Sequence, residues 1–327
     1  MKKYLGLVLT VLVIFFSACG GSPKPEVISY PSWYLNPPAN NGSFLYGVGE
    51  GSNINIAKAA ALSFVSESLS LTVSSKLRKS ESSSSYNGNE NTYRSTVSSL
   101  KAQAKDMEFS EYKIVKNEQI GSRIVLLVEV SRHKLFADQK AKLDLYTKEL
   151  KAEVKDIQKY PLLKQAQLYK ERAKKRYILK SMALLTKTIN SKFKTDAYIT
   201  QAIQVGAAST DALNKVKIFV HSSSKSKVFV SSIKEGLNKA GIKIASKGAN
   251  TNLYIDVNYN LDEIYSFQIA KARLSFTTKS KAKTIATNTV TVSGKSKYGY
   301  DKAKINASNM LKKKIKKDGI FSVLGLK

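Results

Sequence analysis

The single cysteine of this chain constrains its fold most, because it leaves the molecule without an internal disulfide. Two lysines precede an uncharged apolar stretch at 5–16, and small residues then lead to Cys19. The apolar stretch is shorter than the roughly 20 residues that a membrane-spanning helix needs. The pattern therefore predicts a secretory signal at 1–18, followed by an exported body that folds without disulfides.

The stretch Phe16-Ser17-Ala18-Cys19 resembles the lipobox of bacterial lipoproteins, although Phe16 stands where that family usually has leucine. The resemblance implies that Cys19 carries a diacylglyceryl group, that the signal is cut before it, and that the new amine is acylated. Stable anchoring takes two or more acyl chains, which this modification supplies. In that family an aspartate directly after the cysteine retains the protein in the inner membrane. This chain has Gly20 there, so the resemblance implies delivery to the outer membrane. The alternative is a plain cleaved signal with an unmodified cysteine.

The formal charge of +30 raises the question of an anionic partner. The basic residues are mostly lysine and are spread along the chain, whereas arginine is favoured for base and phosphate recognition. Export also separates the chain from nucleic acid, so we expect no nucleic-acid partner. Phospholipid, lipopolysaccharide or cell wall are the expected anionic counterparts. The alternative is a solvated basic surface with no partner at all.

Composition and hydrophobic periodicity divide the chain into five segments. After the signal at 1–18, the Gly/Ser/Pro-rich segment 19–32 predicts a flexible tether. Segments 33–132 and 214–327 mix strand and helix patterns, and 133–213 predicts a helical hairpin arm. Together they predict the α+β class. No segment after the signal reads as apolar enough to span a bilayer, so we expect a soluble body on a lipid tether.

The N-terminal domain opens on the only tryptophan, Trp33, which lies between prolines and is therefore expected outside a helix, packed on the domain edge. The expected elements are a strand at 44–48, an alanine-rich helix at 56–77, a serine-rich loop at 80–90, a weaker helix at 93–105, and a hairpin of strands 107–116 and 123–130. The apolar face expected for the first helix comprises Ala61, Phe64, Val65, Leu69 and Val73.

A glycine-rich stretch follows the first strand, with glycines at positions 47, 49 and 51. It fails the dinucleotide-binding fingerprint, because Ser52 stands where the third glycine would fall. The stretch instead predicts a strand-to-helix turn that needs positive φ.

Several of these features together resemble the Lpp-twenty family of small outer-membrane lipoproteins from epsilon-proteobacteria, over about residues 30–135. The residues that carry the resemblance are Trp33, Pro37, Pro38, Tyr46, Gly47 and Gly49, with the alanine-rich helix and the closing strand. The resemblance implies an envelope role without a catalytic residue. Some relatives of this fold serve flagellar outer-membrane discs or rings.

The arm begins with a long helix at 133–159, in which apolar residues recur every seven positions at Phe136, Leu143, Leu150 and Ile157. Pro161 opens a second helix, and a short third helix is expected at 196–213. An antiparallel hairpin is the simplest arrangement, and one kinked rod is the alternative. The cluster Lys174-Lys175-Arg176 is expected on an exposed face.

The C-terminal pattern predicts the order βαβ-βββ-α, with the helices on one face of the sheet. The expected elements are strands at 216–220 and 242–245 around a helix at 225–240, a strand at 253–259, a hairpin of 267–277 and 284–293, and a helix at 300–316.

No catalytic or metal-binding constellation emerges from the sequence. His133 and His221 stand alone, and Asp262 and Glu263 are adjacent on a strand and so face opposite sides. We expect no enzyme and no cofactor apart from the covalent lipid on Cys19. The predicted function is that of a periplasm-facing outer-membrane lipoprotein with a structural or assembly role and envelope proteins as partners. The alternatives are a basic module that binds cell wall or anionic lipid, and a flagellar disc or ring component.

Overall fold

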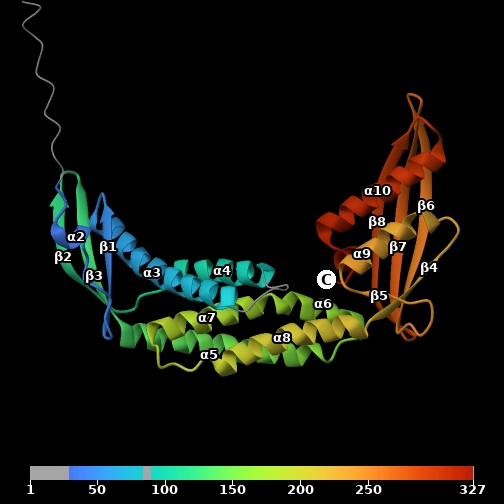
Figure 1. Ribbon diagram of the computed structural model, residues 1–327. Coiled ribbons are helices and arrows are strands. Elements are labelled where there is room, and N and C mark those ends of the chain that lie inside the picture. Colours follow the sequence, from blue (N-terminus) through green and yellow to red (C-terminus); the bar gives the residue numbers. More distant parts are fainter. Residues whose placement is uncertain (1–28, 84–89, 327) are drawn as a thin grey trace, which may run out of the picture. The chain divides into compact units, whose positions relative to one another are not determined.

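The computed structural model describes residues 29–83 and 90–326. They form a mixed α+β protein with one three-stranded and one five-stranded sheet, which confirms the predicted fold class (Figure 1). The chain separates into two compact units. The first takes the residues up to Val65 together with Tyr112–Val130, and the second takes Ser66–Glu111 and Ser131–Lys327.

The first unit is built on the three-stranded sheet, whose strand order is β1-β3-β2. Its elements are α2 (Ser32–Leu35), β1 (Phe44–Gly51), the start of α3 (Ile54–Ser83), β2 (Tyr112–Ile120) and β3 (Arg123–Ser131). Strands β2 and β3 form the predicted antiparallel hairpin, whose turn has Gly121 at φ +58°, but β2 begins at Tyr112 and not at position 107 as expected. The central strand β3 is buried on both faces at 125–128, so it forms the middle of this small core.

Helix α3 is longer than the sequence pattern predicts, because 80–83, expected in a loop, continue the helix. Its buried stripe follows i, i+4 spacing through Ala57, Ala61, Val65, Leu69 and Val73. The expectation that Phe64 belongs to this stripe is wrong, since Phe64 is 44% exposed. It lies one position before Val65 and is therefore turned about 100° away from the stripe.

The glycines of β1 lie inside the strand and not in a turn, and none has the predicted positive φ. They share the face of β1 that packs on α3. A Cβ built on Gly47 would lie 2.2 Å from the carbonyl oxygen of Ala61, and one on Gly49 would lie 2.1 Å from the amide nitrogen of Ala61. The glycines therefore bring the strand into direct backbone contact with the alanine-rich stripe of the helix.

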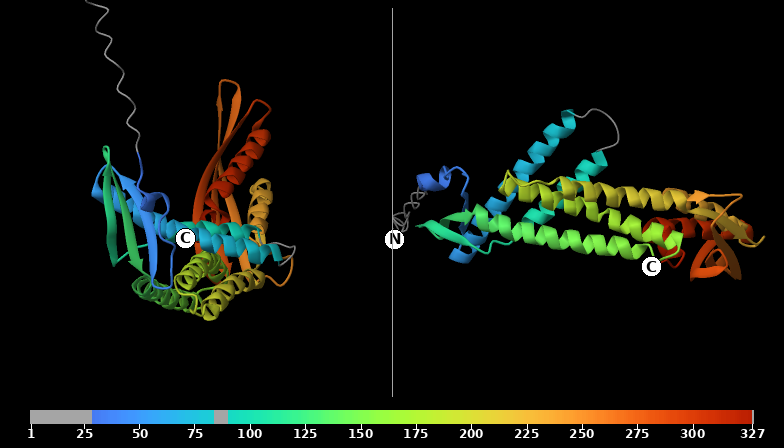
Figure 2. Two further views of the ribbon diagram at one scale, coloured as in Figure 1. Left: turned by 60° about the vertical axis from the view of Figure 1, so that its left-hand side comes forward. Right: turned by 90° about the horizontal axis from the view of Figure 1, so that it is seen from below.

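The second unit contains the helical arm. The helices of the arm are α5 (Arg132–Ile157), α6 (Leu162–Ala173), α7 (Lys175–Ile189) and α8 (Asp196–Lys215). Helix α4 (Glu90–Lys105) belongs to the same unit and packs against α7. Helix α5 packs against both α6 and α7, which join end to end at Lys174, and α8 packs along the same pair (Figure 2). This arrangement is the antiparallel hairpin and not a single kinked rod, with α8 as an added third layer.

The heptad positions Leu143, Leu150 and Ile157 are buried as the spacing predicts. At the first position the prediction fails, because Leu135 is buried there while Phe136 is half-buried. The Phe136 ring packs edge-on against Phe193, with centroids 5.5 Å apart. Leu135 therefore takes the buried position, and Phe136 makes an aromatic contact with Phe193 instead.

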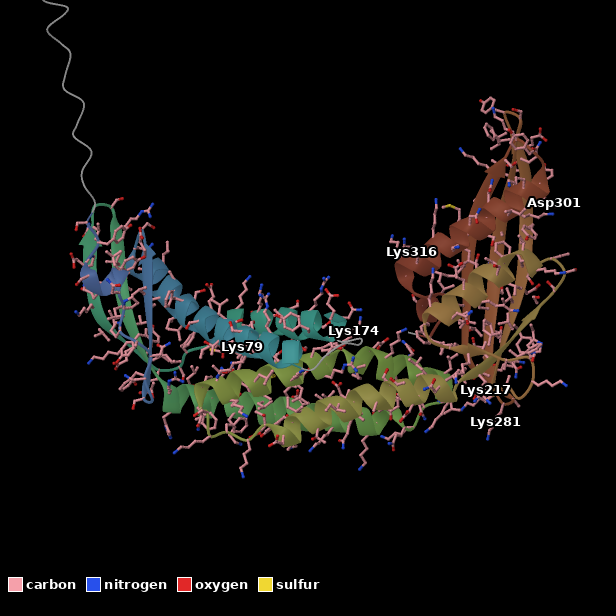
Figure 3. The ribbon with its side chains drawn as sticks, in the orientation of Figure 1. Lys79, Lys174, Lys217, Lys281, Asp301 and Lys316 are labelled. Atoms are coloured by element: carbon pink, nitrogen blue, oxygen red, sulfur yellow. The ribbon has the colours of Figure 1, made fainter. Side chains whose placement is uncertain are left out.

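The basic cluster on the arm does not form one solvated face. Lys174 is exposed, as Figure 3 illustrates. Lys175 Nζ donates to Glu153 Oε1 at 2.6 Å, and Arg176 stacks over the Tyr177 ring with its Cζ 4.7 Å from the centroid. The expectation of an exposed face is therefore wrong for Lys175 and Arg176, which are half-buried. Lys175 forms an ion pair with Glu153, and Arg176 packs on the ring of Tyr177.

The C-terminal elements follow the predicted order βαβ-βββ-α, with one short helix added at the end. They are β4 (Lys217–Ser222), α9 (Lys227–Lys239), β5 (Lys243–Ile244), β6 (Thr251–Ile264), β7 (Phe267–Ser280), β8 (Lys283–Ser296), α10 (Tyr300–Asp318) and α11 (Ile320–Val323). The sheet order is β5-β4-β6-β7-β8, with β4 parallel to both neighbours and β6, β7 and β8 antiparallel.

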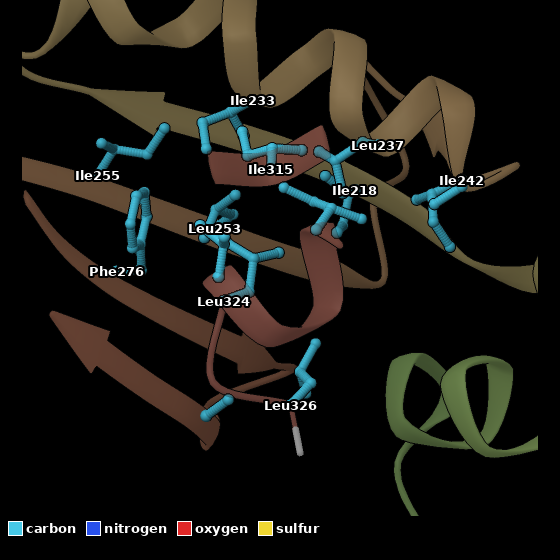
Figure 4. Close-up of a cluster of buried hydrophobic side chains, with 14 of the residues drawn as sticks. Ile218, Ile233, Leu237, Ile242, Leu253, Ile255, Phe276, Ile315, Leu324 and Leu326 are labelled. Atoms are coloured by element: carbon cyan, nitrogen blue, oxygen red, sulfur yellow. The ribbon is translucent and has the colours of Figure 1, made fainter. Parts of the chain in front are cut away.

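Helices α9 and α10 cover one face of this sheet, and buried residues alternate with more exposed ones along much of β6, β7 and β8. Side chains from both helices and the strands form one apolar core, drawn in Figure 4, in which Ile233, Leu253 and Phe276 are almost fully buried. The same core takes in Leu163 and Ala166 of α6. The hairpin arm and the C-terminal sheet therefore share a hydrophobic core within the second unit.

Replacing Gly49 by alanine tests the close contact between β1 and α3. A Cβ at this position would lie within 2.3 Å of backbone atoms of Ala57 and Ala61, which cannot swing aside. We expect the first unit to lose about 1–3 kcal/mol of unfolding free energy, as overpacking generally costs. Denaturant unfolding followed by the fluorescence of Trp33, the only tryptophan, measures this change.

Gly42 provides the matched control, because a Cβ there meets nothing within 4 Å. Gly42→Ala should be neutral or slightly stabilising, since alanine reduces the freedom of the unfolded chain. Equal stability of the two variants would contradict the close-contact interpretation.

Candidate functional site

The predicted lipid anchor lies outside the described residues. Cys19 and Gly20 belong to 1–28, so the anchor and its sorting signal remain predictions. The described chain begins at Ser29, near the end of the predicted tether 19–32. The remaining predicted motif residues lie close to this point, which makes the junction between tether and first unit the candidate site.

Trp33 lies in a short helix, which corrects the expectation that the flanking prolines exclude one. Helix α2 is a single turn, in which the amide of Tyr34 donates to the Pro31 carbonyl at 2.9 Å and the amide of Asn36 donates to that of Ser32 at 2.9 Å. Pro31 precedes the helix, where its missing N–H costs nothing, and Pro37 comes after it. The prolines therefore bound the turn and do not interrupt it.

The acidic side chain at the end of β1 connects this turn to the sheet. Glu50 Oε2 accepts hydrogen bonds from the hydroxyls of Tyr30 at 3.1 Å and Tyr34 at 3.4 Å. Glu50 Oε1 accepts a charge-assisted bond from the Arg123 guanidinium at 2.5 Å. The two tyrosine rings stack with centroids 5.2 Å apart, and Trp33 packs edge-on against Tyr34. We call these five residues the tether junction.

The electrostatics of the tether junction fix its protonation. The hydrogen bond from Arg123 is the largest influence that holds the pKa of Glu50 below its usual value. Its carboxylate raises the pKa of Tyr30 by hydrogen bonding, while burial is the main cause of the raised pKa of Tyr34. At neutral pH the carboxylate is therefore ionised and both phenols are protonated donors, so each group has the form that its hydrogen bonds require.

The other predicted motif residues divide between the two faces of β1. The Tyr46 hydroxyl donates to Glu129 Oε2 of β3 at 3.0 Å, on the same face as Glu50. Gly47 and Gly49 face α3 on the opposite side. Pro37 is half-buried, and Pro38 is exposed. The alternation of β1 therefore separates the motif into a tether-binding face and a helix-binding face.

Sequence reasoning missed Tyr30, Tyr34, Glu50 and Arg123. One usable signal was present, because Glu50 follows Tyr46 and Val48 at two-residue spacing along the strand, which puts all three on the face opposite the glycines. The pairing with Arg123 had no such signal, because it depends on how β3 aligns with β1.

The polar groups of the tether junction hold α2 and the residue Tyr30 against β1. Its carboxylate, guanidinium and phenols bind one another. Among residues 29–83 and 90–326, no group of three His, Cys, Asp or Glu side chains is placed to hold a metal ion. His221 stacks on Tyr254 with centroids 4.3 Å apart, and Asp262 and Glu263 pair with successive residues of β7 and so lie on opposite faces.

One helix of the described chain is long and apolar enough to cross a membrane. It is α3 between Ile54 and Lys79, with a mean hydropathy of 1.3. The expectation that no later segment reaches this level is therefore wrong. Core helices of soluble domains can have the same length and composition. In the first unit Ala57 and Ala61 of α3 are fully buried, and their backbone lies against the glycines of β1.

Comparisons of the sequence with protein-family models and with curated proteins found no match. Among solved structures, the chain is similar to the secreted protein HP1454 from Helicobacter pylori, at 12% identity and a TM-score of 0.43, over 83% of this chain and 95% of that one.

It is also similar to a minor lipoprotein from Acinetobacter baumannii, at 12% identity and a TM-score of 0.27, over 32% of this chain and 93% of that one. The lipoprotein GNA1162 from Neisseria meningitidis matches at 12% identity and a TM-score of 0.25, over 32% and 97% of the two chains. The chain thus has structural similarity to bacterial lipoproteins and to a secreted protein, whose names state no enzymatic activity. At these scores the likeness identifies neither a family nor a role.

Neutralising the carboxylate tests the tether junction. In Glu50→Gln the ion pair with Arg123 is lost and the bonds from both tyrosines weaken. We expect α2 to loosen from β1, with a changed Trp33 emission at neutral pH. Because the pKa of Glu50 is lowered on folding, its stabilisation is present above the ordinary value of 4.5 and is lost as pH falls through the lowered value.

The wild-type chain should therefore show a Trp33 fluorescence transition below pH 4.5, and Glu50→Gln should lack it. Glu118→Gln is the matched control, because Glu118 is exposed on β2 of the same unit. A transition of unchanged midpoint in Glu50→Gln would rule out Glu50 as its source.

Proposed function

We propose that this chain is a lipid-anchored outer-membrane lipoprotein that faces the periplasm and has a structural or assembly role in the cell envelope. The observation that carries the proposal is the stretch Phe16-Ser17-Ala18-Cys19 after a short uncharged apolar run. Acylation gives the single cysteine a use in an exported chain, where it has no partner for a disulfide.

The tether junction fits this proposal as the place where a membrane-anchored chain is fastened to its folded body. The tether that the sequence predicts from Cys19 to Tyr30 would have a root-mean-square reach of roughly 20 Å, at about 5–6 Å times the square root of its length. Because β1 is an edge strand, a load on the tether acts where the sheet is least supported. The bonds from Tyr30 and Tyr34 to Glu50 would pass that load to Arg123 of the central strand.

The Lpp-twenty resemblance forms the finer part of this proposal. Its motif residues have a physical role in the first unit, since Tyr46 binds Glu129 while Gly47 and Gly49 admit the backbone of α3. The flagellar disc or ring alternative comes from the resemblance alone. A deletion strain tests it, because normal motility would count against it.

We propose a non-enzymatic role in which the helical arm offers a surface to envelope proteins. Large apolar side chains stand exposed on two of its helices, with Leu145 of α5 58% exposed and Ile203 of α8 66% exposed. Cross-linking in cells followed by mass spectrometry tests this surface. Partners cross-linked to α5 and α8 support the arm, and partners found only through the other segments contradict it.

The second candidate function is a basic module for cell wall or anionic lipid, which the formal charge of +30 favours. Co-sedimentation of the protein with purified cell wall or with anionic vesicles across a salt series measures it. Charge-driven binding should fall steeply between low and physiological salt, since screening shortens the range of the attraction. Binding that does not change with salt would contradict this candidate.

Replacing Cys19 by alanine tests the anchor. The variant has no thiol to acylate, so we expect it to lose incorporation of labelled palmitate and to leave the outer-membrane fraction. Gly20→Asp should keep the label and move the protein to the inner membrane, as the lipoprotein resemblance implies. Ser22→Ala is the control and should behave as wild type. Unchanged label and fractionation in Cys19→Ala would refute the anchoring proposal.

A further inference from the structure

A cavity of about 620 Å³ opens where α9, α10 and the segment after α10 meet. Its floor is apolar and consists of Gly236, Ala240, Ile315, Ile320 and Phe321. Its rim carries the charged groups Lys170, Glu235, Lys239, Lys312 and Lys316. The cavity lies within the second unit, and none of its residues belongs to the tether junction.

The floor offers an apolar surface with little hydrogen-bonding capacity. Gly236 lets α9 approach closely, since a Cβ there would lie 2.8 Å from Ile315 Cγ2 and 3.3 Å from Ile320 Cδ1. The one hydroxyl in the lining, that of Ser232, already bonds with Ser308 at 3.0 Å. The part of a ligand that contacts this floor must therefore be hydrocarbon, because a polar group there would lose its hydrogen bonds to water without gaining any to the protein.

The rim has an excess of positive charge. Its one carboxylate, Glu235, is shared by Lys239 and Lys312, each with Nζ 2.7 Å from a carboxylate oxygen, which lowers its pKa to about 2. Lys170 is half-buried, and its Nζ donates to the Ala240 carbonyl at 3.0 Å and lies 6.0 Å from the centre of the Phe321 ring. Lys316 is exposed near the end of α10, where Figure 3 labels it.

Two helix C-termini also meet at this rim, because α9 ends at Lys239 and α10 ends at Asp318. Their carbonyl ends carry a fractional negative charge of roughly half an electron each. The four rim lysines outweigh this charge together with that of Glu235. The remaining balance is positive, which favours an anion at the mouth of the cavity.

We infer that this cavity binds a single-chain anionic amphiphile, with its hydrocarbon chain on the apolar floor and its carboxylate or phosphate headgroup among the rim lysines. The volume lies within the roughly 300–1,000 Å³ typical of small-molecule sites. Burial against the core lowers the pKa of Lys170, and an anionic headgroup would offset that cost by pairing with its ammonium group. The site does not depend on acylation of Cys19, so each proposal stands or fails separately.

Titration calorimetry tests the site on the full chain carrying Cys19→Ala, with four probes. Dodecanoate and dodecyl phosphate carry the chain and the two alternative headgroups, dodecanol has no charge, and inorganic phosphate has no chain. We expect saturable binding of one or both anionic amphiphiles, at least tenfold tighter than that of dodecanol or phosphate. The better of the two identifies the headgroup. Binding of dodecanol or phosphate as tight as that of the amphiphiles would overturn the inference, as would no saturable binding.

Two charge-neutralising variants on one helix locate the bound ligand. Lys316→Gln removes a rim cation and should weaken binding at least fivefold, whereas Lys313→Gln removes an exposed cation of α10 outside the cavity and should change it less than twofold. Both side chains are exposed, so both variants should fold. They also share the apolar N-terminal stretch, so amphiphile bound there cancels in the comparison. Equal affinity of the two variants would place the binding elsewhere and overturn the inference.

Discussion

The backbone contact between β1 and α3 is the constraint on which the first unit depends. Gly47 and Gly49 allow a strand to lie against Ala57 and Ala61 at a separation that no side chain would permit. Glycine alone provides this approach, and the facing helix residues Ala57 and Ala61 are fully buried. The same device recurs in the second unit, where a Cβ on Gly294 of β8 would lie 2.1 Å from the carbonyl oxygen of Ala303 in α10. Both sheets thus receive a helix through glycine-to-alanine contact.

One face of β1 packs on α3, and the opposite face contacts Tyr30 and Tyr34, which precede the strand. Alternation along the strand puts Glu50 there, and the ion pair with Arg123 keeps its carboxylate ionised to receive both tyrosine hydroxyls. Loss of the close helix contact would therefore disturb the tether junction as well. The fold and the proposed anchoring role are linked through a single strand of eight residues.

Local patterns predicted most of the fold, and long-range pairing accounts for most of what they missed. Hydrophobic periodicity located the strands of the C-terminal sheet, and seven-residue spacing located Leu143 and Leu150 in the arm. The glycines of β1 were misassigned to a turn because a glycine cluster has the same appearance in a turn and in a close contact. The Glu50–Arg123 pair could not be predicted, since its partners are 73 positions apart and meet only through sheet order. Cys19 differs from these residues, because its predicted role comes from the sequence alone and it lies outside the described residues.

The lipid anchor on Cys19 can be tested by mass spectrometry of the N-terminal peptide, taken from protein extracted from the membrane fraction of its native host. We expect a mature chain that begins at Cys19, with a diacylglyceryl thioether on the sulfur and an acyl group on the new amine. A mature N-terminus at any other residue, or an unmodified Cys19, would contradict it.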